Sequence, residues 1–104
     1  MEIRNEEEFT VVEMPPKLDV NTSPEVERVL LELLAADTMR IACDFSKVHY
    51  ISSAGLRVML VVSKKLKAAK GEFVILSIHP QTFEPFRLAG FDKIMTFKNT
   101  LSST

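Results

Sequence analysis

Apolar positions along the chain alternate between short β-type runs and helical spacing. The run Phe9–Met14 is β-branched and apolar, as strands prefer, and Pro15-Pro16 ends it because proline cannot donate to a strand ladder. Apolar residues then recur at i, i+3 and i+4 from Ser23, the expected N-cap, to about Ala36, which predicts an amphipathic helix. With a short strand at Glu2–Asn5, the first third of the chain is predicted to run strand, strand, helix.

The middle of the chain repeats the strand–helix alternation. Met39–Phe45 contains a short apolar run that predicts a central strand. Ala54–Lys70 has the strongest helical pattern, with a first half that is apolar nearly all round and expected to be deeply buried. Gly71 follows directly, where a left-handed cap residue is expected. The connections 17–23 and 46–53 show no strand pattern and are predicted as loops.

The last third of the chain completes an α/β domain. Glu72–Ser77 is a buried strand by composition, Pro80–Ala89 a shorter helix and Lys93–Phe97 a last strand. This order predicts a single domain over residues 1–98, with a mostly parallel central sheet of about five strands, helices packed on it and right-handed crossovers. The polar residues 99–104 are expected to form a flexible tail.

Composition and charge exclude several classes of function. The chain has 104 residues, 46% of them hydrophobic, and a net charge of −1, which argues against a nucleic-acid or basic membrane-surface module. The single cysteine, Cys43, excludes an internal disulfide, and with only two histidines no metal site is expected. No apolar run is long enough to span a membrane, and the acidic first residues do not resemble a signal peptide. We therefore expect a cytoplasmic module.

Two consecutive serines stand where a loop delivers the chain to the most strongly predicted helix. Ser52 or Ser53 would be its N-cap, and a helix start offers free N–H groups and a partial positive charge. A phosphate on one of these serines would meet favourable electrostatics there. A serine before a helix is also a common cap, so the residues alone leave both roles open.

The sequence contains no recognisable catalytic motif. Ile51 stands two positions before Ser53, so the G-x-S-x-G elbow of serine hydrolases is absent, and His49 lies in a segment expected to be exposed. No glycine-rich phosphate loop is present, so neither ATP nor another cofactor is expected to bind. We expect a protein that is not an enzyme.

The segment DFSKVHYISSAGLRVML resembles the signature of the STAS domain found in bacterial anti-sigma factor antagonists. Members of that family carry an Asp-(hydrophobic)-Ser strand end, an aromatic or hydrophobic pair, and then Asp-Ser-(Ser/Thr/Ala)-Gly-Leu opening a helix. The positions that fit are Asp44, Ser46, Val48, Tyr50, Ile51, Ser53, Ala54, Gly55 and Leu56. A second match is Leu18-Asp19, followed by Thr22 and a helix, and the predicted order of elements agrees over nearly the whole chain.

The resemblance implies transcription regulation by partner switching. Ser53 would be the phospho-acceptor, and the unmodified protein would bind an anti-sigma factor that is also a serine kinase, which frees the sigma factor. Phosphorylation would dissociate the complex, and a PP2C-type phosphatase would reset it. The implied partner-binding residues are Asp19, Thr22, Ser52, Ser53, Gly55 and Arg57.

The chain departs from the family pattern beside the acceptor. Ser52 replaces the usual aspartate and is a competing phosphorylation site, and Arg57 stands where a small residue is common. If Arg57 faces outward, it can pair with a phosphate or an acidic partner. The alternative is a non-phosphorylated STAS scaffold or transport-associated subunit, in which Ser53 is a plain helix cap.

Overall fold

A mixed sheet of five strands forms the frame of the molecule in the computed structural model, which describes residues 1–102. β1 is antiparallel to β2, and all other neighbours are parallel, with β4 in the centre of the order β1-β2-β4-β6-β7. The mostly parallel sheet and the central place of the strand after the first helix are therefore confirmed. The strands are β1 (Ile3–Glu6), β2 (Phe9–Glu13), β4 (Arg40–Asp44), β6 (Glu72–Leu76) and β7 (Thr96–Lys98).

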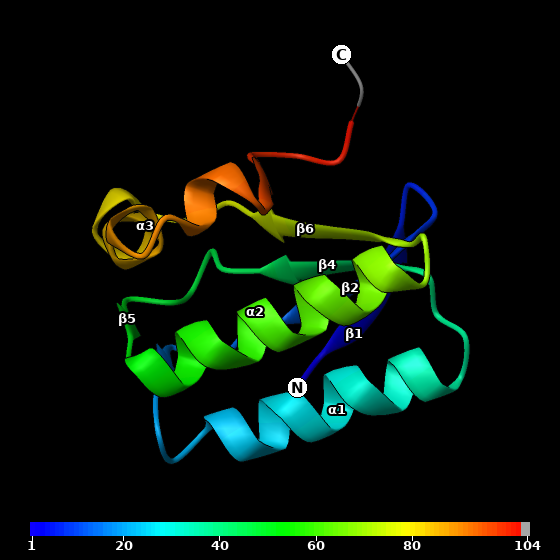
Figure 1. Cartoon of the computed structure of the whole chain (residues 1–104), viewed down its shortest axis with the longest axis horizontal. Helices are drawn as coiled ribbons and strands as arrows, with labels where there is room; N and C mark the ends of the chain where they lie inside the picture. The colour runs from blue at the N-terminus through cyan, green and yellow to red at the C-terminus, as the bar shows by residue number, and fades with distance from the viewer. Residues whose placement is uncertain (103–104) are drawn as a thin grey trace.

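Helices cover one face of this sheet. α1 (Ser23–Ala35) and α2 (Ser53–Ala68) lie side by side in front of the strands, and α3 (Pro80–Leu88) lies at the end where the chain leaves β4 (Figure 1). Between sheet and helices, the inward-facing strand residues meet the buried side of α2, which includes Val58, Met59 and Val62. Only this side of the helix is deeply buried. The first half of α2 was expected to be buried nearly all round, but Arg57 in the same apolar stretch is exposed.

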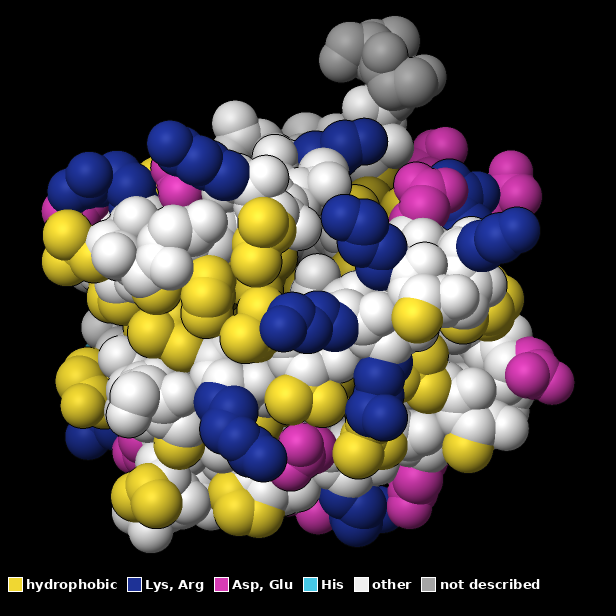
Figure 2. Space-filling view, in the orientation of Figure 1, with side chains coloured by type: hydrophobic (Ala, Val, Ile, Leu, Met, Phe, Trp, Pro, Cys, Tyr) yellow, Lys and Arg dark blue, Asp and Glu magenta, His cyan; other side chains and the backbone are white. Residues whose placement is uncertain are grey.

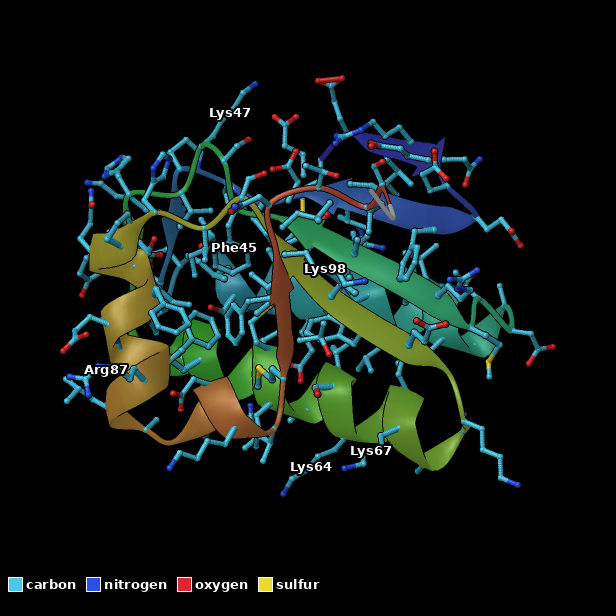
Figure 3. All side chains as sticks on the ribbon, turned by 90° about the horizontal axis from the view of Figure 1, so that it is seen from above. Phe45, Lys47, Lys64, Lys67, Arg87 and Lys98 are labelled. Atoms are coloured by element: carbon cyan, nitrogen blue, oxygen red, sulfur yellow. The ribbon has the colours of Figure 1, made fainter. Side chains whose placement is uncertain are left out.

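Aromatic rings attach α3 to the end of the sheet. The Phe86 ring is fully buried and meets the rings of Phe45 and Phe97 edge-on, with centroid distances of 5.9 and 5.4 Å. Phe45, labelled in Figure 3, directly follows β4 and lies between the sheet and α3. The start of the β4–β5 connection is therefore held by packing as well as by its backbone.

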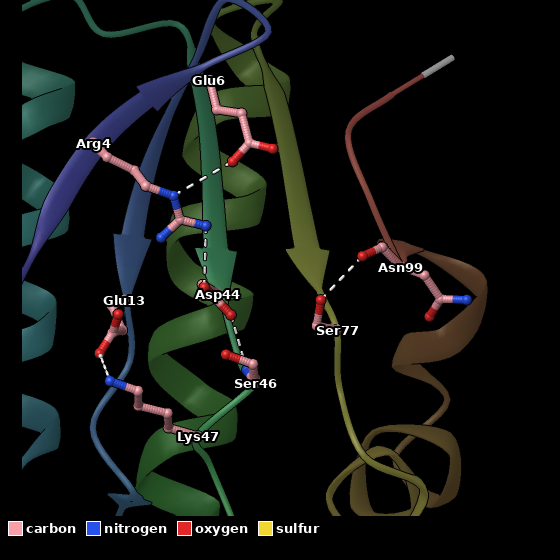
Figure 4. Close-up of polar contacts among 8 residues, drawn as sticks. All are labelled: Arg4, Glu6, Glu13, Asp44, Ser46, Lys47, Ser77 and Asn99. Carbon is pink, nitrogen blue, oxygen red and sulfur yellow. Dashed lines mark hydrogen bonds and ion pairs between the residues drawn. The ribbon is translucent and has the colours of Figure 1, made fainter. Parts of the chain in front are cut away.

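The outer face of the sheet is covered without a helix. Apolar side chains of its strands, among them Val11 and Ala42, form a second buried cluster together with Leu101 from the C-terminal segment. The Ser77 hydroxyl donates to the carbonyl of Asn99 at 3.0 Å, which directs residues 99–102 back over the sheet (Figure 4). Leu101 thus packs on the domain beyond the boundary expected at residue 98, while residues 103–104 of the expected tail lie outside the described residues.

A small second sheet occupies the two connections that were expected to be loops. β3 (Lys17–Leu18) pairs in parallel with β5 (Tyr50–Ile51). Two-residue strands are too short to produce a period-2 pattern, so the expectation of plain loops was wrong for a physical reason. The last strand was expected at Lys93–Phe97, but β7 covers only Thr96–Lys98, and Lys93 belongs to a 3₁₀ helix, η1 (Phe91–Lys93).

The helix ends differ from the sequence-based expectation in two places. Thr22, and not Ser23, is the N-cap of α1, and the buried Ser23 hydroxyl has no hydrogen-bond partner. After α2 the left-handed residue is Lys70, with φ of 64°, and not Gly71. Gly71 is required for a different reason, because a Cβ there would lie 2.3 Å from the carbonyl oxygen of Met39.

Candidate functional site

The small β3–β5 sheet joins the two segments that the sequence marked as functional. Leu18 pairs with Ile51, and the N–H of Ser52 donates to the Leu18 carbonyl at 3.0 Å. Because the two strands are parallel, the residues that follow them leave the sheet on the same side. Asp19 is therefore placed beside the start of α2, although it lies 33 positions before Ser52 in the sequence.

Gly55 makes this approach possible. A Cβ on Gly55 would lie 2.6 Å from the Leu18 carbonyl oxygen, 2.8 Å from Leu18 Cγ and 2.9 Å from Ile51 Cγ1. These distances are shorter than carbon van der Waals contacts allow, so the first turn of α2 can pack on β3 only with glycine there. Gly55 is itself buried, so its contribution to a binding surface is to position its neighbours.

The two serines at the start of α2 have different environments. Ser52 occupies the N-cap position with extended backbone, and its hydroxyl oxygen is buried without a hydrogen-bond partner. Ser53 is the first residue of the helix and is exposed to solvent. Neither side chain makes a capping hydrogen bond, so the interpretation of Ser53 as a plain helix cap is wrong. The first N–H groups of α2 have no side-chain partner and give the helix start a positive character.

Asp19 and Thr22 build the turn that leads into α1. One carboxylate oxygen of Asp19 accepts the N–H groups of Asn21 and Thr22, at 3.0 and 3.2 Å. The Thr22 hydroxyl donates to the Lys17 carbonyl at 2.7 Å and accepts the N–H of Asp19 at 3.0 Å. Thr22 is thus engaged inside the turn, whereas the second Asp19 oxygen is free to accept from a partner.

A shallow groove of about 200 Å³ runs between the first turns of α1 and α2, beside Ser53. Arg57 lines it from α2, Glu27 lines it from α1, and Val20 forms part of its rim. Val20 is 70% exposed, and Arg57 forms no ion pair with any residue of the described chain. An outward-facing arginine beside an exposed apolar side chain is typical of a protein-binding surface.

The loop that carries the serines is anchored where it leaves β4. Asp44 is buried, and its carboxylate accepts the N–H of Ser46 at 2.9 Å and a guanidinium N–H of Arg4 at 3.2 Å (Figure 4). Burial alone would raise the pKa of Asp44, but the hydrogen bonds from Ser46 and the charge of Arg4 outweigh it and lower the pKa below its ordinary value. The ionised Asp44 therefore fixes the first turn of the β4–β5 connection.

The structure brings together most of the residues that the sequence singled out. Asp19, Ser52, Ser53 and Arg57 meet at one end of the α1–α2 layer, with Gly55 beneath them. Sequence reasoning missed Val20 as part of this surface, because nothing in its pattern distinguishes an exposed valine from a buried one. In residues 1–102, no cluster of His, Cys, Asp or Glu is arranged to hold a metal ion, and no helix is long and apolar enough to cross a membrane.

Comparison with known proteins identifies the family. The sequence profile of the STAS domain matches residues 1–104. The chain belongs to the STAS domain family. Over 84 residues, this STAS domain is 37% identical to BtrV of Bordetella bronchiseptica, which is named as a candidate anti-sigma factor antagonist; the alignment covers 78% of this chain and 72% of BtrV. It is 28% identical over 95 residues to the anti-sigma-B factor antagonist of Staphylococcus aureus, covering 91% of this chain and 88% of the relative.

Solved structures show the same fold. A candidate anti-sigma factor antagonist of Thermotoga maritima superimposes with a TM-score of 0.87 at 22% identity, covering 96% of this STAS domain and 86% of that chain. An anti-sigma factor antagonist of Mycobacterium paratuberculosis superimposes with a TM-score of 0.84 at 26% identity, covering 95% and 84%. The STAS resemblance and the α/β fold expected from the sequence are both confirmed.

Proposed function

We propose that this STAS domain is an anti-sigma factor antagonist that acts in the cytoplasm by reversible protein–protein binding and has no catalytic activity of its own. Its partner is an anti-sigma factor with serine kinase activity. The observation that carries the proposal is the exposed hydroxyl of Ser53 at the uncapped start of α2, on the surface that also holds Asp19. The names of the Bordetella and Staphylococcus relatives support the same role.

The environments of the two serines favour Ser53 as the phospho-acceptor. The Ser52 oxygen is buried, so its side chain would have to change rotamer before a kinase could reach it, whereas Ser53 lies open to solvent. Ser52 stands where the family usually has an aspartate before the acceptor. The surface still carries an acidic group, because the β3–β5 pairing holds Asp19 beside Ser52.

Phosphorylation would change this surface strongly with little backbone movement. Transfer of the γ-phosphoryl group of ATP to Ser53 Oγ releases ADP and the hydroxyl proton. It leaves on Ser53 a phosphate that carries a charge of about −1.5 to −2. The N–H groups at the start of α2 stabilise that charge, and Arg57, one helical turn further and without an acidic partner, can pair with it. A partner that fits the neutral surface then meets bulk and negative charge and dissociates, until a PP2C-type phosphatase removes the phosphate.

The test compares partner binding by matched variants. Wild-type protein is used to capture the anti-sigma factor from the host, and the affinity of the purified pair is then measured for wild type, Ser53→Asp and Ser53→Ala. We expect Ser53→Asp to weaken binding at least tenfold, about 1.4 kcal/mol, and Ser53→Ala to bind like wild type. Gln81→Glu, which adds one negative charge on the exposed start of α3, is the control and should bind like wild type. Equal binding by Ser53→Asp and wild type would favour the non-phosphorylated scaffold instead.

A further inference from the structure

A second hollow, of about 270 Å³, lies at the opposite end of α2 from Ser53, where β6 begins. We call it the β6 notch. The C-terminal part of α2 supplies one wall with Ser63 and Lys67. Ile94 and the strand β7, with Thr96 and Lys98, supply the other. At a rise of 1.5 Å per residue, Ser53 and Lys67 are about 21 Å apart along the helix axis. The notch is therefore a separate surface from the candidate switch.

The notch carries uncompensated positive charge. Among residues 1–102, neither Lys67 nor Lys98 forms an ion pair, and α2 contains no acidic residue. The one carboxylate in the lining, Glu72, is paired with Arg40 at 3.1 Å. Lysine and arginine side chains spread along α2 in Figure 2, and Figure 3 shows Lys67 and Lys98 on their separate elements. In a chain with a net charge of −1, this is a local excess of positive charge.

The floor of the notch is an open edge of the sheet. β6 runs from Glu72 to Leu76, but β7 pairs only with Val74–Leu76. Next to Glu72 and Phe73 the sheet has no strand on the β7 side. Glu72 already donates its N–H to the Met39 carbonyl at 2.7 Å, so Phe73 is the residue whose backbone this edge presents to an incoming chain. Ile94, which is 50% exposed, adds an apolar contact at the rim.

We propose that the β6 notch binds an extended, acidic segment of a protein partner. Carboxylates of the segment pair with Lys67 and Lys98, its backbone meets the open edge of β6, and an apolar side chain packs on Ile94. The open edge favours a polypeptide over a free anion, because a small anion makes no use of strand pairing. The separation from Ser53 exceeds the Debye length of about 8 Å at physiological salt, so binding here is independent of phosphorylation. The inference goes beyond the proposed function and does not require it.

The test is an NMR titration of the full ¹⁵N-labelled chain with a blocked peptide, acetyl-Glu-Leu-Glu-Val-Glu-amide. We expect saturable shifts of the Phe73 and Thr96 amides and no shift at Ser53. The double variant Lys67→Glu/Lys98→Glu should bind at least tenfold more weakly. Lys17→Glu/Lys65→Glu, which changes the charge equally, should differ from wild type by less than threefold, since Lys65 is two residues from Lys67 and faces another side of the helix.

Three results would overturn the inference. The first is equal loss of binding in both double variants, which would indicate unspecific attraction to positive charge. The second is an equally strong shift of the same amides with free glutarate, which would indicate a small-anion site. The third is the absence of saturable shifts. Ser53→Asp should bind the peptide within twofold of wild type, so failure of the notch and failure of the Ser53 switch give different outcomes.

Discussion

Replacing Gly55 by alanine tests whether the candidate site is assembled as the structure indicates. The new Cβ would lie 2.6 Å from the carbonyl oxygen of Leu18 and 2.9 Å from Ile51 Cγ1, where ordinary contacts are at least 3.4 Å. Leu18 belongs to β3, the strand that holds Asp19 beside α2. The clash therefore weakens the contact between β3 and the first turn of α2. The helix start and β3 must move apart by several tenths of an ångström.

The expected cost follows from two opposing effects. Overpacking a close contact costs about 1–3 kcal/mol, and contacts with a backbone carbonyl belong to the upper part of that range. Replacing glycine by alanine inside a helix returns up to about 1 kcal/mol. We therefore expect Gly55→Ala to lower the free energy of unfolding by about 1–2 kcal/mol, measured by urea denaturation, and to lower the midpoint of thermal unfolding by roughly 4–16 °C.

Ser53→Ala is the matched control for this substitution. Ser53 lies two residues earlier in the same helix, is exposed and makes no capping hydrogen bond, so its replacement should change the free energy of unfolding by less than about 0.5 kcal/mol. If Gly55→Ala were as stable as Ser53→Ala, the close approach of α2 to β3 would be refuted. If Gly55→Ala were destabilised but bound the anti-sigma factor like wild type, Asp19 and α2 would not act as one surface.

Two further substitutions test the anchoring of the loop and of the C-terminal segment. The pKa of Asp44 is lowered in the folded state, so its contribution to stability is present above the ordinary aspartate pKa of about 3.9 and is lost as the pH falls through the lower folded value. Asp44→Asn should therefore destabilise the domain in urea unfolding at pH 7 and by clearly less at pH 3, and an equal loss at both pH values would contradict the assignment. Leu101 is 8% exposed in the outer cluster, so Leu101→Ala should cost about 1–2 kcal/mol, below the range of a central leucine, and a change under 0.5 kcal/mol would show that residues 99–102 do not cover the sheet.

The periodic parts of the chain were predictable from the sequence. The spacing of Val26, Val29 and Leu30 defined the buried side of α1, and the apolar run around Ala42 placed β4 in the centre of the sheet. Hydrophobic burial determines these elements, and buried positions recur with a regular spacing that can be recognised in a single sequence.

Features that depend on a single close contact were not predictable. The two-residue strands β3 and β5 are stabilised by backbone hydrogen bonds and by the fit of Gly55 against Leu18, and neither leaves a pattern. The difference between Ser52 and Ser53 is also invisible in the sequence, because it depends on how the connection after β5 turns into α2. The β6 notch is lined by Lys67 from α2 and Lys98 from β7, two residues that only the packing of the elements brings to one hollow.

The position of the phosphate tests most directly whether Ser53 is the switch. Wild type, Ser52→Ala and Ser53→Ala are each incubated with the captured anti-sigma factor and ATP, and the phosphorylated residue is mapped by mass spectrometry on the bound and released protein. We expect one phosphate, on Ser53, in wild type and Ser52→Ala, found mainly in the released protein, and none in Ser53→Ala. Phosphate on Ser52, or no phosphate on wild type in the presence of a kinase that is active on another substrate, would contradict the claim that exposed Ser53 is the switch.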